Sequence, residues 1–254
     1  MKRHSITVPV VFLLLSCLAL AQQPAEPPVF TYVAEWTIAR ADWDQFNKTF
    51  EQSSRPILDR LLANGTIIGY GSFATYVHEA DAPTHGDWWS ASSLANIEKA
   101  RAELIKAAVN PAMAAAKHRD YLLRSIFHKG SMVKPGPGFL VVSESQVQAG
   151  KGADWRQLWE KYTKPVYDQL VADGTITQYS VDVEQVHTQD PGTRYIWYTT
   201  SGADGVDKVG AALNAAAQAR GEQEQRTIGL QMQAVTNGAA HRDYWATIAT
   251  YAHK

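Results

Sequence analysis

One stretch of this chain occurs twice, and the repeat constrains the possible fold more than any other feature. The first copy covers Ala41–Tyr70 and the second covers Ala153–Tyr179. Each copy has the pattern of a helix with an acidic start and an internal proline, followed by a glycine and a strand. The glycines Gly65 and Gly174 lie 109 residues apart, and the same spacing relates Phe30 to Phe139, Glu35 to Glu144 and Trp88 to Trp197. We therefore predict one supersecondary unit written twice.

Alternation of apolar residues, helical periodicity and turn residues divide the first unit into elements. The predicted elements are a strand at Phe30–Ile38, a helix from Asp42 to Gly65, strands at Thr66–His78 and Asp87–Ser92, a helix at Leu94–Val109 and a last strand after His118. The second unit repeats this order, with a longer second helix from Val206 to about Val235. The order β-α-β-β-α-β is that of the ferredoxin-like unit.

Local signals within the first helix of each unit predict its details. Asp42 and Asp154 each precede a glutamine by three residues, which predicts a helix-capping pair. The internal prolines should restart each helix, and the following glycines should end it in the left-handed conformation. The first unit has three more residues than the second between cap and proline, which predicts a bulge near Ser53 and Ser54.

The helix-to-strand junction Leu61-Leu62-Ala63-Asn64-Gly65-Thr66-Ile67-Ile68-Gly69-Tyr70 resembles that of the dimeric α/β-barrel superfamily, and the element order agrees from Phe30 to His253. The resemblance implies two ferredoxin-like units that form one intramolecular barrel with helices outside. Members include cofactor-free monooxygenases, isomerases and haem enzymes, but their catalytic motifs do not map onto this chain. Gly202-Ala203-Asp204-Gly205 is one residue short of a haem-peroxidase motif, so no cofactor is predicted.

The chain begins with the features of an export signal. Lys2 and Arg3 precede an apolar run, and Ala19-Leu20-Ala21 fits a cleavage site. An alternative is a lipoprotein signal with Cys17 as the acylated residue. The predicted domains are 1–21 signal peptide, 22–29 proline-rich lead-in, 30–129 first repeat, 130–138 linker and 139–254 second repeat.

Composition limits the partners and the location that we expect. Cys17 is the sole cysteine, so the folded part has no disulfide or thiol nucleophile. Charges are scattered and nearly balanced, which argues against nucleic-acid binding, and after signal cleavage we expect no membrane segment. We expect a periplasmic or secreted monomer with an internal pseudo-two-fold axis, because the second unit covers the sheet of the first.

Two glutamates are the candidate catalytic residues. Tyr32, Ala34 and Trp36 share one face of the first strand, and Glu35 falls on the other. If the apolar face packs on the helices, Glu35 and Glu144 point into the barrel, where burial should raise their pKa. Either could act as a general base or ligand anchor. The alternative is a glutamate hydrogen-bonded in a packed barrel or exposed at its end.

Other residues are candidate ligand contacts. His-Arg-Asp-Tyr occurs at 118–121 and at 241–244, and its histidines His118 and His241 could form acid/base sites, although two equivalent copies favour a structural joint. The remaining candidates are Tyr70, Tyr179, Trp88 and Trp197. The histidines do not supply three convergent ligands, so no metal site is predicted.

Three functions remain open from the sequence. The barrel interior could bind a small apolar or aromatic molecule. The chain could instead be a cofactor-free monooxygenase or isomerase with Glu35 or Glu144 as base and Tyr70 or Tyr179 as donor. It could also be a non-catalytic interaction module if side chains fill the barrel. Catalysis should leave one half of the molecule polar and the other plugged.

Overall fold

Eight antiparallel strands form one closed barrel in a computed structural model that describes residues 27–80, 82–107, 110–114, 116–188 and 190–254. The strand order around the barrel is β1-β3-β2-β8-β5-β7-β6-β4, and β4 closes onto β1. The predicted export signal, including Cys17, lies outside the described residues. The α+β class and the barrel agree with the sequence prediction.

The elements of the first half are β1 (Phe30–Thr37), α1 (Trp43–Thr49), a π-helical turn (Phe50–Ser54), α2 (Arg55–Ala63), β2 (Gly69–Thr75), β3 (His85–Ala91), α3 (Leu94–Leu104) and β4 (Lys117–Gly130). Short 3₁₀ turns at Arg40–Asp42 and Pro111–Met113 flank them. The elements of the second half are β5 (Val133–Val147), α4 (Gly152–Tyr162), α5 (Lys164–Ala172), β6 (Gln178–Glu184), β7 (Thr193–Thr200), α6 (Ala203–Gln218), α7 (Gly221–Val235) and β8 (Thr236–His253).

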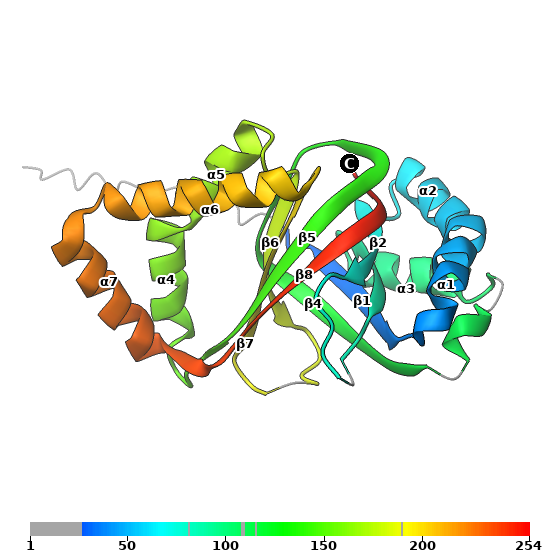
Figure 1. The fold of residues 1–254 in the computed structure, drawn as a ribbon, viewed down its shortest axis with the longest axis horizontal. Coiled ribbons are helices and arrows are strands. Elements are labelled where there is room, and N and C mark those ends of the chain that lie inside the picture. Colours follow the sequence, from blue (N-terminus) through cyan, green and yellow to red (C-terminus); the bar gives the residue numbers. More distant parts are fainter. Residues whose placement is uncertain (1–26, 81, 108–109, 115, 189) are drawn as a thin grey trace, which may run out of the picture.

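Both halves arrange their strands in the same way. Within each half the fourth strand lies beside the first, the first beside the third and the third beside the second. The second strand of each half then pairs with the fourth strand of the other, through β2–β8 and β4–β6. Helices α1 to α3 lie outside one side of the barrel and α4 to α7 outside the other (Figure 1). Each half thus supplies the sheet edges that the other needs.

The helix-to-strand junctions follow the sequence signals closely. Gly65 and Gly174 end α2 and α5 with φ values of 76° and 80°, which confirms the left-handed stops. The π-helical turn Phe50–Ser54 accommodates the extra residues of the first copy and confirms the predicted bulge. The capping prediction was wrong. Asp42 makes no side-chain cap, and Asp154 lies inside the first turn of α4, where it pairs with Lys151 at 3.1 Å.

Two segments between the predicted elements differ from the expectation. From Val133 onwards the predicted linker 130–138 is already strand β5, which pairs with β8 at Val133 and His253. The long second helix predicted up to Val235 is two helices, because Gly221 has a φ of 73° and breaks it between α6 and α7.

Side chains fill the inside of the barrel. Val33, Trp88, Tyr121, Leu140 and Trp197 belong to one buried interior cluster drawn from both halves. The cavity that remains beside them measures about 40 Å³, which is far below the 300–1,000 Å³ of typical ligand pockets. The described residues therefore do not form the ligand cavity that was expected inside the barrel. Large aromatic side chains from facing strands meet at its centre instead.

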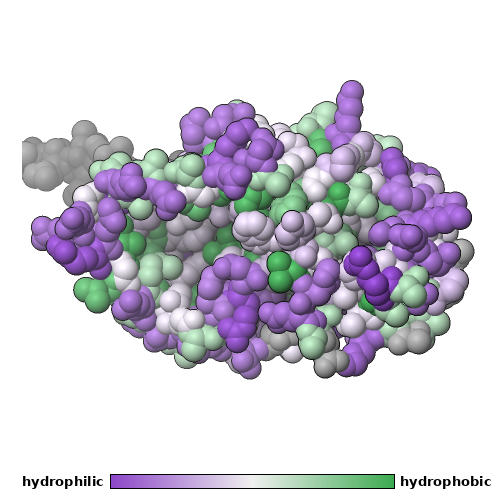
Figure 2. Space-filling view, in the orientation of Figure 1, coloured by the Kyte–Doolittle hydropathy of each residue, from purple (hydrophilic) through white to green (hydrophobic). Residues whose placement is uncertain are grey.

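The outer surface of the helices is largely polar. Hydrophilic side chains predominate around α7 at the left of Figure 2, whereas pale and green residues are interspersed along α6. Within the described part of the chain, the helices are too short or too polar to cross a membrane.

Candidate functional site

A cavity with the dimensions of a ligand pocket lies outside the barrel, between the sheet of the first half and its helices. Its volume is about 380 Å³, within the range of small-molecule sites. Strands β1, β3 and β4 form its floor, and α1, the π-helical turn, α2 and α3 form its roof. Aromatic side chains make most of its wall: Trp36, Phe46, Phe50 and Trp89.

Asp87 is a polar residue in the wall of this cavity that was not among the candidates from the sequence. It lies on β3 between the interior residues Gly86 and Trp88, so alternation turns its side chain towards the helices. Burial raises the pKa of the Asp87 carboxyl to about 7, although a hydrogen bond from Ser72 opposes the shift. The Oδ1 atom of Asp87 and the Nε1 atom of Trp89 are both buried without a hydrogen-bond partner among the described residues.

There is open space on the helix side of Asp87 because the residue paired with it on the neighbouring strand is small. Ala34 pairs with Asp87 on β3 and with Asp120 on β4, so the three residues form one row across the sheet. The methyl group of Ala34 separates the two carboxylates without filling the space between them. A larger residue at this position would project into the cavity.

The rim of the cavity contains a chain of polar contacts. The His118 Nε2 atom lies 2.8 Å from the Asp120 Oδ1 atom, and the imidazole of His118 stacks on Trp36 with ring centroids 5.0 Å apart. Asp120 also accepts a hydrogen bond from the Tyr32 hydroxyl. Burial, reinforced by Asp120 and opposed by Arg101, raises the pKa of Tyr32 to about 12. The Tyr32 hydroxyl therefore remains a proton donor at neutral pH.

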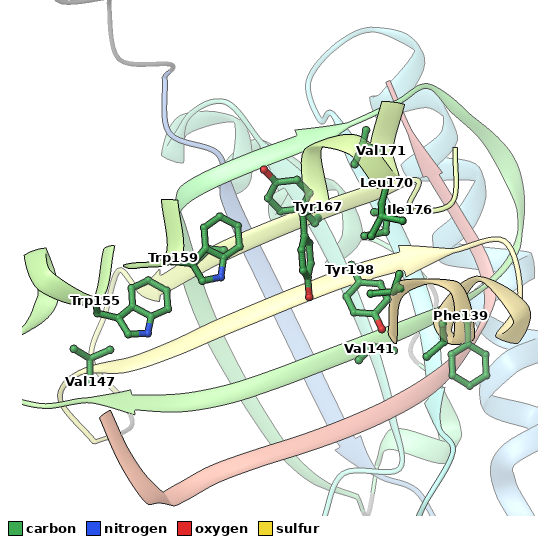
Figure 3. Packing of buried hydrophobic residues seen from close by; sticks show 14 of the residues in the cluster. Phe139, Val141, Val147, Trp155, Trp159, Tyr167, Leu170, Val171, Ile176 and Tyr198 are labelled. Atoms are coloured by element: carbon green, nitrogen blue, oxygen red, sulfur yellow. The ribbon is translucent and has the colours of Figure 1, made fainter. Parts of the chain in front are cut away.

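In the second half, the corresponding space is filled with aromatic and aliphatic side chains. Ile196 lies 109 residues after Asp87, and Tyr167 lies 109 residues after Leu58. Tyr167 packs edge-on against Tyr198 at 5.8 Å and lies 5.9 Å from Trp159. Figure 3 shows these aromatic residues packed against one face of the sheet. The space that corresponds to the Asp87 cavity is therefore packed in the second half and open in the first, which is an asymmetry expected of a functional site.

Glu35 and Glu144 occupy the barrel interior rather than this cavity. Only 2% of Glu35 is exposed, and its carboxylate accepts hydrogen bonds from Arg119 Nε at 2.5 Å and from the Tyr121 hydroxyl at 3.1 Å. Burial raises the pKa of Glu144, and the charge of Glu35 adds to the rise against the opposing charge of Arg119. The two glutamates thus point inward, as their alternation predicted, and the structure also brings their charges close enough to interact.

The two copies of His-Arg-Asp-Tyr differ in one contact. Arg119 pairs with Glu35, whereas Arg242 donates its hydrogen bonds to the carbonyl groups of Ala239 and His241. His241 contacts Asp243 at 3.0 Å at the exposed end of β8, away from the cavity. The second copy therefore has the character of a structural joint, while the first also supplies His118 and Asp120 to the cavity.

The remaining sequence candidates lie apart from the cavity. Tyr70 and Tyr179 face the helices, where their hydroxyls donate to Asp59 and Asp168. Neither tyrosine reaches Glu35 or Glu144, so the expected donor–base pair is not formed. Trp88 and Trp197 pack in the barrel interior, and Trp197 Nε1 donates to Asp182 at 2.6 Å. The described residues contain no group of three or more acidic, histidine or cysteine side chains that could hold a metal ion.

We expect Ala34→Leu to fill the cavity from its floor. The added side chain would occupy the space above Asp87 and reduce binding of any molecule held there by at least about tenfold, since cavity volume limits the ligand. Unfolding stability should fall by less than about 1 kcal/mol or rise, because the empty space accepts the added atoms. Quenching of tryptophan fluorescence by 2-naphthol measures binding, and Ser143→Leu, at the equivalent position of the second half, is the matched control.

Comparison with known proteins addresses the fold. No family model matches this sequence, and no curated protein matches it either. Among solved structures, a candidate monooxygenase of Fusobacterium nucleatum aligns with a TM-score of 0.60 at 8% identity, over 89% of this chain and 94% of that one. An anthrone oxidase-like protein aligns at 0.49 with 11% identity over 89% and 92%. A chlorite dismutase variant from Candidatus Nitrospira defluvii aligns at 0.48 with 10% identity over 87% and 91%.

The closed barrel and the structural alignment at a TM-score of 0.60 together identify the fold. This chain has the dimeric α/β-barrel fold, built from ferredoxin-like strand arrangements within one polypeptide.

Proposed function

We propose that this protein binds a small organic molecule with an aromatic or apolar body in the cavity of the first half, and that Asp87 removes a proton from it. The observation that carries the proposal is Asp87 itself: a half-buried residue in the wall of a cavity of about 380 Å³, with a carboxyl pKa raised to about 7 and an Oδ1 atom that has no hydrogen-bond partner among the described residues. A general base works best when its pKa lies near the working pH. The cavity also retains a buried polar group at a cost in stability, which is typical of functional sites.

The chemistry follows from the groups that face the cavity. The Asp87 carboxylate takes a proton from an acidic C–H or O–H group, and the electron pair stays on the substrate as an enolate or phenolate. The unpartnered Trp89 Nε1–H can donate a hydrogen bond to the resulting oxyanion. Asp87 then returns the same proton to another atom of the substrate. This sequence is an isomerisation and is balanced without an oxidant.

The oxygenase alternative uses the same first step. If dioxygen adds to the carbanion, Asp87 supplies the proton for a hydroperoxide, which loses water and leaves a carbonyl group on the former CH₂ carbon. Dioxygen is the oxidant, and water is the second product. The candidate monooxygenase of F. nucleatum shares the fold and makes this reaction worth testing. Oxygen consumption during substrate conversion separates it from isomerisation.

A proton-abstraction probe tests the proposal without knowledge of the natural substrate. A base that removes the C3 proton of 5-nitrobenzisoxazole opens its ring to a coloured phenolate. We expect the protein to accelerate this reaction, with a rate that rises with pH and levels off above about pH 7 because the Asp87 carboxylate is the active form. Asp87→Asn should lower the rate by about a hundredfold or more.

A second buried aspartate provides the matched control. Burial also raises the pKa of Asp182 to about 7, but Asp182 lies inside the barrel, where Ser180 and Trp197 donate to its carboxyl. Asp182→Asn should leave the probe reaction unchanged. Equal rates for the wild-type protein and Asp87→Asn would contradict the assignment of Asp87 as base.

Export and assembly also belong to the proposal. We propose a tandem-duplicated, exported protein that begins at Gln22 after signal cleavage and acts as a periplasmic or secreted monomer. Pairing of β2 with β8 and of β4 with β6 closes the barrel within one chain, which supports the monomer. The mass of the exported protein distinguishes a start at Gln22 from a lipid on Cys17, and light scattering measures the assembly state.

A further inference from the structure

A second cavity, on the helix side of the second half, has a strongly basic lining. It measures about 810 Å³, and five cationic side chains and one acidic one line it. Lys129 and Lys164 both contact the acidic residue, Asp168, at 3.4 Å and 2.6 Å. Asp168 can offset only one positive charge, so the lining of this cavity keeps a net positive charge. This basic cavity is separate from the Asp87 cavity, which only residues of the first half line.

Arg124 and Arg194 lie near each other on the outer face of the sheet. Arg124 on β4 pairs with Val183 on β6, and Arg194 on β7 directly precedes Tyr195, the partner of Asp182 on β6. Burial and the charge of Arg124 lower the pKa of Arg194. Within the described residues neither arginine forms an ion pair, and the buried Nε atom of Arg194 has no hydrogen-bond partner. Two neighbouring guanidinium groups without a counterion are electrostatically unfavourable.

The start of helix α4 adds a third positive element. A side-chain carbon at Gly152, the first residue of α4, would lie 3.6 Å from the Arg194 Nη2 atom, so this guanidinium packs against the helix N-terminus. The residue before it, Lys151, makes no side-chain cap, and the first backbone N–H groups of the helix therefore remain available. The helix dipole places partial positive charge at the same point.

Part of the wall of the basic cavity is apolar. Ile126, Phe127 and Val183 line it, and the Arg156 guanidinium lies over the Phe127 ring at 5.0 Å. Arg156 is also paired with Glu160 at 3.1 Å, and the Arg194 Nη1 atom donates to the carbonyl groups of Gly192 and Thr193. Arg124 and the other side of the Arg194 guanidinium therefore remain for a ligand. A ligand that fits both features carries an oxyanion at one end and an apolar body at the other.

We propose that the basic cavity binds an organic anion, a carboxylate or phosphate monoester with an aromatic or apolar body, through Arg124, Arg194 and the N-terminus of α4. Arginine presents two parallel N–H donors to a carboxylate or phosphate, which matches this ligand class. The apolar wall near Phe127 receives the rest of the molecule. The site is independent of Asp87 and of the proton transfer assigned to it.

Calorimetric titration with phenyl phosphate tests the site. We expect saturable binding to the wild-type protein, about tenfold or weaker binding to Arg124→Gln and to Arg194→Gln, and weaker binding at higher salt. Arg226→Gln is the matched control, because Arg226 is an exposed arginine on α7 whose ion pair with Glu222 spans 3.8 Å; its affinity should be unchanged. Asp87→Asn should also bind phenyl phosphate normally, so failure of the proton-transfer proposal leaves this result intact.

Three outcomes would overturn the inference. One is the absence of phenyl phosphate binding to the wild-type protein, and another is equal weakening by Arg226→Gln. Binding of inorganic phosphate as tight as that of phenyl phosphate would contradict an organic ligand. Folding is checked by circular dichroism, and Arg194→Lys provides a variant that keeps the charge and loses the paired donors. Its binding should lie between those of the wild-type protein and Arg194→Gln.

Discussion

Asp87→Asn should make the protein more stable at pH 8 while it removes the reactive base. The carboxyl of Asp87 has a pKa of about 7 in the folded protein against 3.8 for the ordinary group, because burial penalises its charge. When folding raises the pKa of a carboxyl group, its contribution to folding stability is fully present below the pKa of the unfolded state. That contribution is lost as the pH rises through the pKa of the folded state. The wild-type protein therefore loses stability at this residue between about pH 4 and pH 7, and the asparagine variant does not.

The expected size of the effect can be measured by urea unfolding at pH 5 and pH 8. A difference of one between the folded and unfolded pKa values corresponds to about 1.4 kcal/mol. We therefore expect the stability of Asp87→Asn relative to wild type to rise by about 2 to 3 kcal/mol between these pH values. Asp182→Asn should show a similar pH dependence, because burial raises the pKa of Asp182 in the same direction. The two variants differ in the probe reaction, which only Asp87→Asn should abolish.

Buried histidines give folding stability the opposite dependence on pH. For this reason the wild-type protein has to be compared with Asp87→Asn at each pH. Burial lowers the pKa of His85 to about 4 and that of His128 to about 3. Their contribution to stability is lost as pH falls below about 6.5, the ordinary value for histidine. The wild-type curve therefore mixes both effects, whereas the difference between wild type and Asp87→Asn isolates the aspartate. A difference that does not change between pH 5 and pH 8 would contradict the raised pKa.

Arg119→Met should destabilise the protein by about 2 to 3 kcal/mol. The side chain of Glu35 is 3% exposed and would keep only the Tyr121 hydroxyl as partner, so its buried charge would be left without compensation. Removing one partner of a buried pair costs about 3 to 5 kcal/mol, and the 43% exposure of the Arg119 side chain reduces this value. Urea unfolding at pH 7 measures the change.

The double variant Glu35→Gln/Arg119→Met separates the buried charge from other effects. It carries no charge at this end of β1, so it should recover at least half of the stability lost in Arg119→Met. Glu35→Gln alone should retain the reaction with 5-nitrobenzisoxazole, since Glu35 points into the barrel and away from the Asp87 cavity. Loss of the reaction in Glu35→Gln would contradict the assignment of Asp87 as the base and would indicate Glu35 instead.

The sequence contains a feature that could have identified Asp87 as a candidate site residue. The alternation pattern alone did not reveal it. Asp87 stands beside two tryptophans in a strand, and the residue 109 positions later is Ile196. A comparison of the two copies position by position marks this exchange of a carboxyl for an aliphatic group as unusual. Its meaning required the structure, because a strand residue faces either the barrel or the helices and each face is buried here.

Local residue patterns in the sequence were sufficient to predict the architecture. Gly65 and Gly174 end their helices because only glycine adopts a positive φ there at low cost, and the period of two in β1 placed Glu35 on the inward face. Both features depend on a few neighbouring residues, so they can be read without knowledge of the rest of the chain. The repeated order of elements then favoured a barrel in which each half covers the other.

Long-range packing decided where space remains in the molecule. Residues from facing strands fill the barrel interior. Tyr167 and Tyr198 occupy the space of the second half that corresponds to the Asp87 cavity, so this space is open only beneath the π-helical turn of the first half. Arg119 and Arg242 occupy equivalent sequence positions, yet only Arg119 pairs with a glutamate. Cavity volume and ion pairing depend on side chains brought together from distant segments, and local sequence patterns do not contain that information.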